Sequence, residues 1–203
     1  MLPELLQKAN VYKLLFFIDC DFSDSVKSQR CPVCSGVLHQ ADYPRKPRGP
    51  FKNIPDKYQK RHSLCCSSES CRKRSLPPSC RFMGRKVYFW PVILIVMALR
   101  QNRENSYSAG KLMRLFNISR NTLKRWFTFF KECFPLLPKW QRIRGLIPAN
   151  ISNDEIPGRL LHAYLEHFDG DGLHALIQCL IVLESQGDFS VKIDGFIAHA
   201  EDG

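Results

Sequence analysis

The stretch Ser108–Phe134, SAGKLMRLFNISRNTLKRWFTFFKECF, predicts two short helices joined by a tight turn. Apolar residues recur at helical spacing in both halves. Asn117 stands at the expected corner, where Asn tolerates the positive φ that a sharp turn needs. Ser119 follows as an N-cap, because its hydroxyl can accept a hydrogen bond from a free backbone N–H. The apolar positions are Leu112, Leu115, Phe116, Ile118, Leu123, Trp126, Phe127 and Phe130.

The outer face of the second predicted helix, at about residues 119–131, is polar and basic. No acidic residue lies between Ser106 and Lys131. This layout is typical of a helix-turn-helix, whose second helix enters the major groove of DNA. An ordinary helical hairpin with a solvated basic face is the alternative. Arg can pair with guanine and Asn with adenine, so we expect DNA contacts from Ser119, Arg120, Asn121, Lys124, Arg125 and Thr128.

The charge of the chain divides near residue 150. Residues 1–150 hold 28 Lys and Arg against 9 Asp and Glu, which gives +19. Residues 151–203 hold 2 against 10, which gives −8 and leaves a net charge of +11. A segment of +19 favours a polyanion such as double-stranded DNA as its partner. The acidic end indicates a partner-binding module or an internal screen against non-specific binding.

The ends and apolar runs of the chain indicate its compartment. The N-terminal MLPELLQKAN has no basic region or cleavage site of a secretory signal. The longest apolar run, Val87–Leu99, is shorter than the about 20 residues that a membrane span needs. We therefore expect a cytoplasmic protein without a membrane partner. Nine cysteines in a reducing compartment indicate metal binding rather than disulfides.

Two cysteine pairs have the spacing of zinc ligands. Cys31 and Cys34 form a CxxC motif, and Gly36 is expected to let the backbone turn so that its amides face the sulfurs. Cys66 and Cys71 provide the second pair. We predict a closed, non-catalytic zinc ribbon, whose metal supplies folding free energy of about 10–16 kcal/mol in comparable peptides. Buried thiols are the alternative, and the rival ligands are Cys65, then Cys80, His39 and His62.

Basic segments flank these cysteines. The stretch Ala41–Phe51, ADYPRKPRGPF, is rich in proline and is expected to be extended. It is either a strip that follows phosphates or a minor groove, or a plain surface loop. A second basic run directly follows Cys71. The expected phosphate-contacting residues in the two segments are Arg45, Lys46, Arg48, Arg72, Lys73 and Arg74.

The remaining patterns complete a mainly α fold with a small β zinc ribbon. A buried helix at Val92–Leu99, begun by Pro91, is expected to form a three-helix unit with the helix-turn-helix. A short basic helix or turn at residues 139–144 and a helical hairpin near residues 160–183, joined by residues 169–172, are expected to follow. We predict three segments: a basic zinc module at 1–86, a DNA-binding domain at 87–147 and an acidic helical module at 148–203. The last fifteen residues show no clear pattern.

The N-terminal segment is ambiguous. Residues 11–18 fit a strand or a helix, and Asp19, Asp21 and Asp24 in DCDFSD fit a polar loop. Paired carboxylates also serve Mg²⁺-dependent transposases and nucleases, but Asp154 and Glu155 are the nearest further pair, far along the chain. We therefore predict no enzyme, and keep a Mg²⁺-dependent nuclease subunit or a basic adaptor for RNA or protein as alternatives.

The order of these parts resembles a family of bacterial proteins associated with mobile elements. The similarity covers about residues 28–185, and it is carried by CPVC, ADYPRKPRGP, CCSSESCRKR, SLPPSCRFMGRKVY and ISRNTLKRWFTFFKECFP. Such proteins join a zinc-ribbon-like segment to a transposase-type helix-turn-helix. The resemblance implies DNA binding in a transposition setting near the bacterial nucleoid. We expect the acidic C-terminal helices to pair with a transposase or with a second copy of the chain. Cys80 departs from the apolar residue expected at its position.

Overall fold

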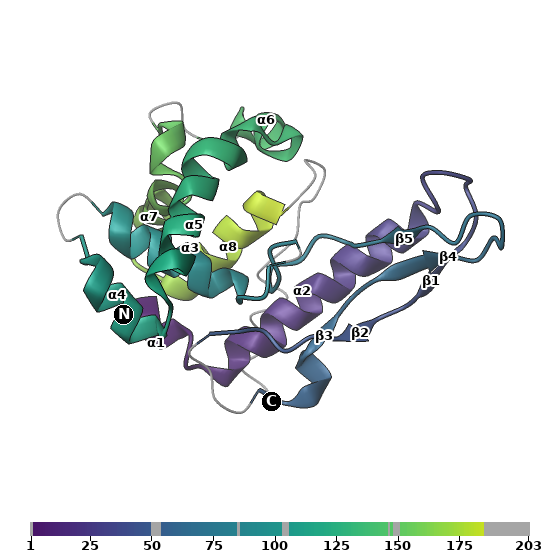
Figure 1. Ribbon diagram of the computed structural model, residues 1–203, viewed down its shortest axis with the longest axis horizontal. Coiled ribbons are helices and arrows are strands. Elements are labelled where there is room, and N and C mark those ends of the chain that lie inside the picture. Colours follow the sequence, from purple (N-terminus) through teal and green to yellow (C-terminus); the bar gives the residue numbers. More distant parts are fainter. Residues whose placement is uncertain are drawn as a thin grey trace.

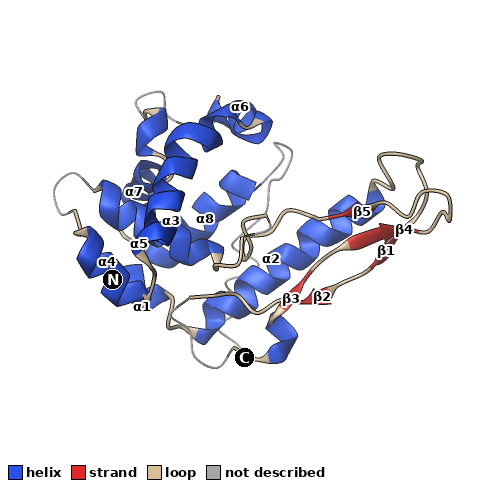
Figure 2. Ribbon diagram, in the orientation of Figure 1, coloured by secondary structure: helices blue, strands red, loops and turns tan. Residues whose placement is uncertain are grey.

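The computed structural model describes residues 2–49, 54–84, 86–102, 106–145, 147 and 151–184. The structure is mainly helical with small antiparallel sheets, which confirms the predicted fold class to that extent (Figures 1 and 2). The α-helices are α1 Leu2–Leu5, α2 Ala9–Ser28, α3 Trp90–Gln101, α4 Ala109–Phe116, α5 Arg120–Thr128, α6 Pro138–Arg144, α7 Gly158–His167 and α8 Gly172–Glu184. The strands are β1 Leu38–Gln40, β2 Tyr43–Pro44, β3 Lys60–Arg61, β4 Leu64–Cys66 and β5 Arg74–Ser75. Short turns are η1 Asp56–Tyr58, η2 Phe129–Cys133, η3 Phe134–Leu136 and η4 Asn153–Glu155.

Helix α2 is the longest element and corrects the prediction for the N-terminal segment. The DCDFSD sequence is its C-terminal half, not a polar loop, because its residues still follow the helical period. Phe22 and Ser23 are buried, whereas Asp21 and Asp24 are exposed. Asp19 is fully buried and accepts hydrogen bonds from the Ser79 hydroxyl, the Cys80 amide and the Arg81 Nε at 2.5–2.8 Å. Ion pairing therefore offsets the cost of this buried carboxylate.

The strands lie beside α2 and form an arm that projects from the helices (Figures 1 and 2). Strand β4 is central in the order β1-β4-β5, and Leu38 pairs with Cys66 across β1 and β4. A separate two-stranded sheet joins β2 and β3. We call residues 31–49 and 54–75 the cysteine module. Its small apolar cluster consists of Cys31, Leu38, Leu64 and Cys66, with Val26 of α2 and Cys71 packed against it.

The helices α1 and α3–α8, which we call the helical region, enclose the large core. Helix α3 is buried from Trp90 to Ala98, which confirms the prediction of a buried helix, and Pro91 occupies its first turn. Helices α7 and α8 form the C-terminal hairpin, joined through Asp169–Asp171, and both contact α3. Helix α8 is mostly buried, so the outward surface of the hairpin belongs mainly to α7.

One apolar core crosses the boundaries that the sequence predicts. It contains Leu14 and Ile18 of α2, Ile93 of α3 and Leu176 of α8, so residues from all three predicted segments pack together. The predicted boundary at 148 and the last fifteen residues lie outside the described residues. Within the described part of the chain, no helix is both long and apolar enough to cross a membrane.

Candidate metal centre and nucleic-acid interface

The first cysteine pair lies in a tight loop that follows α2. Ser35 N–H donates to the Cys31 carbonyl at 2.8 Å, and Cys31 N–H donates to the Gly36 carbonyl at 2.9 Å. Ser35, not Gly36, takes the left-handed conformation, with a φ of 57°. The prediction that Gly36 makes the turn is therefore wrong. A Cβ at Gly36 would lie 2.9 Å from the Cys66 Sγ and 3.3 Å from the Cys34 Sγ, so glycine there makes room for the sulfurs.

The second pair is supplied by the end of β4 and the turn after it. Cys66 is buried and Cys71 follows a turn in which its N–H donates to the Ser68 carbonyl at 3.1 Å. The Sγ of the neighbouring Cys65 lies 3.8 Å from the Arg72 carbonyl oxygen and is not part of the sulfur cluster. This is the alternation expected of a strand, and it selects Cys66 over Cys65.

The four sulfurs of Cys31, Cys34, Cys66 and Cys71 lie within 4.8 Å of one another. The Sγ atoms of Cys31 and Cys71 are 3.8 Å apart, and those of Cys34 and Cys66 are 3.4 Å apart. Four sulfurs bound at about 2.3 Å in a tetrahedron would lie about 3.8 Å from one another, so the spacing fits a zinc-sized ion. The four cysteines thus form a cluster that could hold a metal ion.

Backbone amides surround this cluster. Hydrogen bonds from the N–H groups of Val33 and Cys34 lower the pKa of the Cys31 thiol to about 7. The N–H groups of Gly36, Ser68 and Lys73 donate to Cys34, Cys66 and Cys71 respectively and act to lower the pKa of each thiol, but burial and the neighbouring sulfurs outweigh them and raise the pKa of these three thiols. Such hydrogen bonds favour thiolates, which are the form that binds metal. The donor set is therefore suited to a closed cation site.

The rival ligands lie elsewhere. Cys80 is buried in the large core, and His39 is exposed on β1. His62 belongs to a different group that the sequence did not indicate: its Nδ1 lies 2.9 Å from Asp42 Oδ2 and its Nε2 lies 3.5 Å from Cys20 Sγ. Burial and the carboxylates of α2 raise the pKa of Cys20 to about 11, so this thiol is protonated at neutral pH. No local motif links these three residues, so only the fold reveals them.

Helices α4 and α5 meet at the expected corner. Asn117 has a φ of 48° and a ψ of 51°, and Ser119 accepts a hydrogen bond from Thr122 N–H at 3.1 Å as the N-cap of α5. Leu123 and Trp126 of α5 are buried. Helix α5 ends at Thr128 and continues as the π-helical turn η2, so it is shorter than the predicted 119–131. The exposed residues of this face are Ser119, Arg120, Asn121, Lys124, Arg125 and Thr128.

The proline-rich strip lies next to this helix pair. Arg48 forms a parallel bridge with Tyr88, and the Tyr88 ring packs edge-to-face on Trp126 of α5 at 5.0 Å between centroids. Arg48 also shares a cavity wall with Asn117. The exposed side chains of Lys46 and Arg48 thus extend the basic surface of α5. The guanidinium of Arg45 donates hydrogen bonds to the carbonyls of Gly84 and Lys86, so this side chain also holds the strip in place.

The third basic run lies on the cysteine module. Arg72, Lys73 and Arg74 are all exposed beside Cys71. The acidic residues of DCDFSD have other environments. Asp19 forms an ion pair with Arg81, whereas Asp21 and Asp24 are exposed on α2. Among the described residues, the one group of His, Cys, Asp and Glu side chains arranged for a metal ion is the four-cysteine cluster.

Comparison of the chain with protein-family models, curated proteins and solved structures finds no match. The resemblance to mobile-element proteins therefore remains a prediction.

Proposed function

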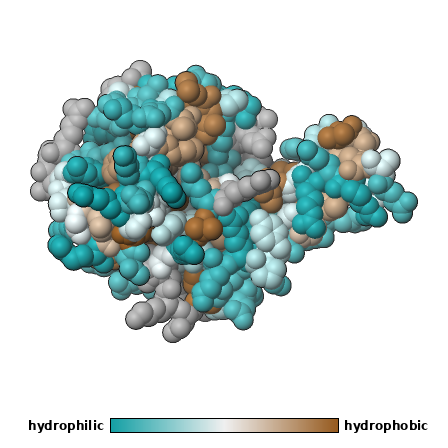
Figure 3. Space-filling model, in the orientation of Figure 1, coloured by the Kyte–Doolittle hydropathy of each residue, from teal (hydrophilic) through white to brown (hydrophobic). Residues whose placement is uncertain are grey.

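We propose that this chain is a zinc-stabilised protein that binds double-stranded DNA and serves a bacterial mobile element. The observation that carries the proposal is the outer face of α5. Its cations Arg120, Lys124 and Arg125 are exposed, and no ion pair joins any of them to a described carboxylate. In Figure 3 the surface around α5 is mostly hydrophilic. An unpaired cationic face on a well-packed helix favours binding of a polyanion.

The shape of the α4–α5 pair suits this role as a helix-turn-helix. Helix α5 has nine residues and is therefore about 13 Å long, and an α-helix with its side chains is about 10–12 Å across, which fits a major groove about 12 Å wide. Arg120 and Asn121 are at its N-terminus, where recognition helices contact base edges. Lys124, Arg125 and Thr128 follow along the same face. We assign base contacts to the N-terminal residues and phosphate contacts to the later ones.

The cysteine module has a supporting role in this proposal. A zinc ion held by Cys31, Cys34, Cys66 and Cys71 would stabilise a ribbon-like sheet that has little apolar core of its own. Lys46, Arg48, Arg72, Lys73 and Arg74 would contact phosphates, whereas Arg45 would hold the strip in place. Because all four ligands are protein sulfurs, the ion would have a structural role and no open position for catalysis.

The proposed association with a mobile element rests on the family resemblance, and it suggests which partner the C-terminal helices bind. A transposase or a second copy would bind the outward side of α7, since α8 is occupied by its own core contacts. The acidic composition of residues 151–203 as a whole suits a basic partner. We place the protein at the bacterial nucleoid.

A mobility-shift experiment tests the proposal. We expect Lys124→Ala combined with Arg125→Ala to weaken binding of duplex DNA at least tenfold and to reduce the salt slope by about 2, because two phosphate or base contacts are lost. The matched control is Lys27→Ala combined with Arg142→Ala, which removes the same charge from exposed sites on α2 and α6. Equal affinities of the two double variants would remove α5 from the interface. Tighter binding of RNA than of duplex DNA of equal length would favour the adaptor alternative.

A further inference from the structure

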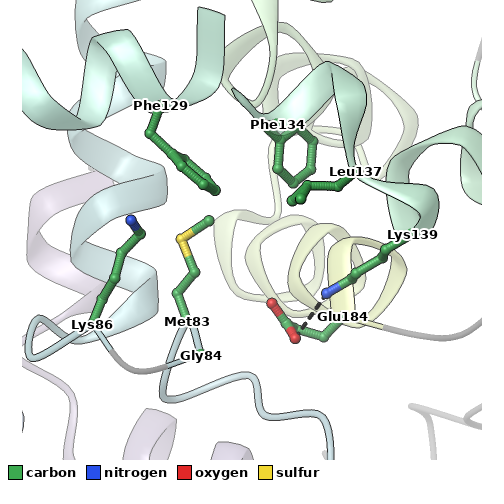
Figure 4. A pocket seen from close by; sticks show the side chains of 8 residues that line it. All are labelled: Met83, Gly84, Lys86, Phe129, Phe134, Leu137, Lys139 and Glu184. Carbon is green, nitrogen blue, oxygen red and sulfur yellow. Dashed lines mark ion pairs between the residues drawn. The ribbon is translucent and has the colours of Figure 1, made fainter. Parts of the chain in front are cut away.

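A cavity of about 530 Å³ lies where three stretches of the chain meet in the helical region. Its walls come from the segment before α3, the turns η2 and η3, the start of α6 and the end of α8 (Figure 4). This volume is in the usual range for small-molecule sites, about 300–1,000 Å³. The cavity belongs neither to the four-cysteine cluster nor to the outer face of α5.

The aromatic wall is preformed. The π-helical turn η2 directly follows α5 and brings Phe129, Phe130 and Phe134 together, with neighbouring ring centroids 5.1–6.0 Å apart. Phe130 is buried and stacks on Trp90 of α3, which fixes the turn against the core. Met83 enters the cavity below Phe129 and Phe134 (Figure 4). A thioether beside aromatic rings adapts well to a flat apolar ligand, and π-helical turns are frequent at functional sites.

The carboxylate in the cavity is already neutralised. Glu184 is 8% exposed and accepts a hydrogen bond from Trp90 Nε1 at 2.9 Å. Its other oxygen lies 2.8 Å from Lys139 Nζ. This wall therefore has a satisfied ion pair and does not attract a cation.

The cation on the opposite side has no such partner. Lys86 Nζ lies 4.0 Å from the centroid of the Phe129 ring, and no described carboxylate forms an ion pair with it. Partial burial lowers the pKa of Lys86, which means that its ammonium lacks part of its hydration. The ammonium and the aromatic rings face the same space in Figure 4. An anion attached to a flat apolar body complements both.

We propose that this cavity binds a small aromatic anion, with its ring between Phe129, Phe134 and Met83 and its acid group on the Lys86 ammonium. This inference does not depend on DNA binding. The binding energy comes from apolar burial, and the charge of Lys86 selects acids over neutral or cationic analogues.

Two probes of nearly equal shape test the selection. The first is 1-anilinonaphthalene-8-sulfonate, and the second is N-phenyl-1-naphthylamine, which lacks the sulfonate. We expect calorimetry to show one site for the sulfonate and affinity about tenfold higher than for the neutral probe. With ¹³C-methyl methionine, the sulfonate is expected to shift the Met83 signal and to leave those of Met97 and Met113 unchanged, since neither lines the cavity.

Substitutions of Lys86 test whether its ammonium binds the acid group of the ligand. Lys86→Met is expected to weaken sulfonate binding about tenfold and to leave the neutral probe unaffected, whereas Lys86→Arg retains binding. The matched control is Lys111→Met, because Lys111 also lies over an aromatic ring, that of Tyr107 at 3.6 Å, but outside the cavity. Equal effects of Lys86→Met and Lys111→Met would overturn the proposal. So would equal affinity of the wild-type protein for both probes, or a sulfonate complex in which the Met83 signal does not move.

Discussion

The helical region and the cysteine module are stabilised by different means, although one long helix joins them. The helical region buries a continuous apolar core in which α3 is enclosed from Trp90 to Ala98. The module buries only four side chains in its own cluster, and two of them are cysteines of the candidate metal centre. Apolar burial at about 25 cal/mol per Å² can maintain the first region. The second needs another source of free energy, and the sulfur cluster is placed to supply it through a metal ion.

The largest expected effect is selective loss of the module when one sulfur is removed. Cys66→Ser should abolish tight metal binding, and the module should lose stabilisation of about 10 kcal/mol or more, by analogy with zinc-finger peptides. The helical region should remain folded. All three tryptophans, Trp90, Trp126 and Trp140, lie in that region, so their fluorescence reports it alone.

The measurement is metal content together with amide hydrogen exchange. We expect fast exchange in residues 31–49 and 54–75 of Cys66→Ser and native tryptophan fluorescence in the same sample. Cys65→Ser is the matched control, since Cys65 faces away from the cluster, and it should keep the metal and slow exchange. A variant Cys66→Ser that retains stoichiometric metal and protection would show that the module does not depend on the cluster.

The second prediction concerns the buried link between the two regions. Asp19 of α2 holds Arg81, whose guanidinium also donates to the Tyr58 carbonyl at 2.6 Å. Asp19→Asn leaves the Arg81 charge buried without its anion, and the free energy of unfolding should fall by about 3–5 kcal/mol. Asp21→Asn, an exposed change on the same helix, should alter it by less than about 0.5 kcal/mol. Urea unfolding followed by tryptophan fluorescence measures both, and similar midpoints for the two variants would contradict the assignment.

Local chemistry explains what the sequence could predict. The four-cysteine cluster follows from two short motifs, and strand alternation predicts that only one of Cys65 and Cys66 joins it, whereas the structure shows that this one is Cys66. The corner at Asn117 and the cap at Ser119 follow from the properties of single residues. The buried helix α3 follows from its unbroken apolar run. In each case the determining residues are close together in the chain.

Long-range pairing explains what the sequence could not predict. Asp19 was assigned to a polar loop because its partner Arg81 is 62 residues away. The hydrogen bonds of Arg45 are likewise hidden from the sequence, since the carbonyls that it binds belong to the distant Gly84 and Lys86. The cavity at Lys86 is formed by three separate segments and has no motif. Charge alone does not show whether a side chain faces solvent or another part of the chain.

A third prediction tests how closely the module is built around the sulfurs. Gly36→Ala puts a methyl group 2.9 Å from Cys66 Sγ and should lower metal affinity about 10–100-fold, as changes next to metal ligands do. Gly145→Ala is the control in the helical region, where nothing lies within 4 Å of the added carbon. Competition with a chromogenic chelator measures the affinity. Equal affinities in the two variants would mean that the loop has room for a side chain.

The smallest effect should come from a helix cap in the helical region, and it should depend on pH. Asp171 Oδ1 accepts hydrogen bonds from the N–H groups of Leu173 and His174 at the start of α8, and Oδ2 lies 2.6 Å from His174 Nδ1. Partial burial acts to raise the pKa of Asp171, but these hydrogen bonds outweigh it and lower the pKa below 3.8. A carboxyl with a lowered folded-state pKa stabilises the fold fully above the unfolded value, and this stabilisation is lost as the pH falls through the folded value.

Asp171→Ala should therefore reduce the free energy of unfolding by about 1 kcal/mol at pH 7, and the difference from wild type should shrink towards pH 3. Glu166→Gln, which removes an exposed charge from α7, should show neither the loss nor the pH dependence. Urea titrations by tryptophan fluorescence at both pH values measure this, because the signal excludes the cysteine module. A difference that grew towards pH 3 would reverse the sign of the linkage and would mean that the cap works through the protonated carboxyl. Acid also protonates the four cysteine sulfurs, so a metal ion held by the module should be released over this range, which makes acid a second way to separate the two regions.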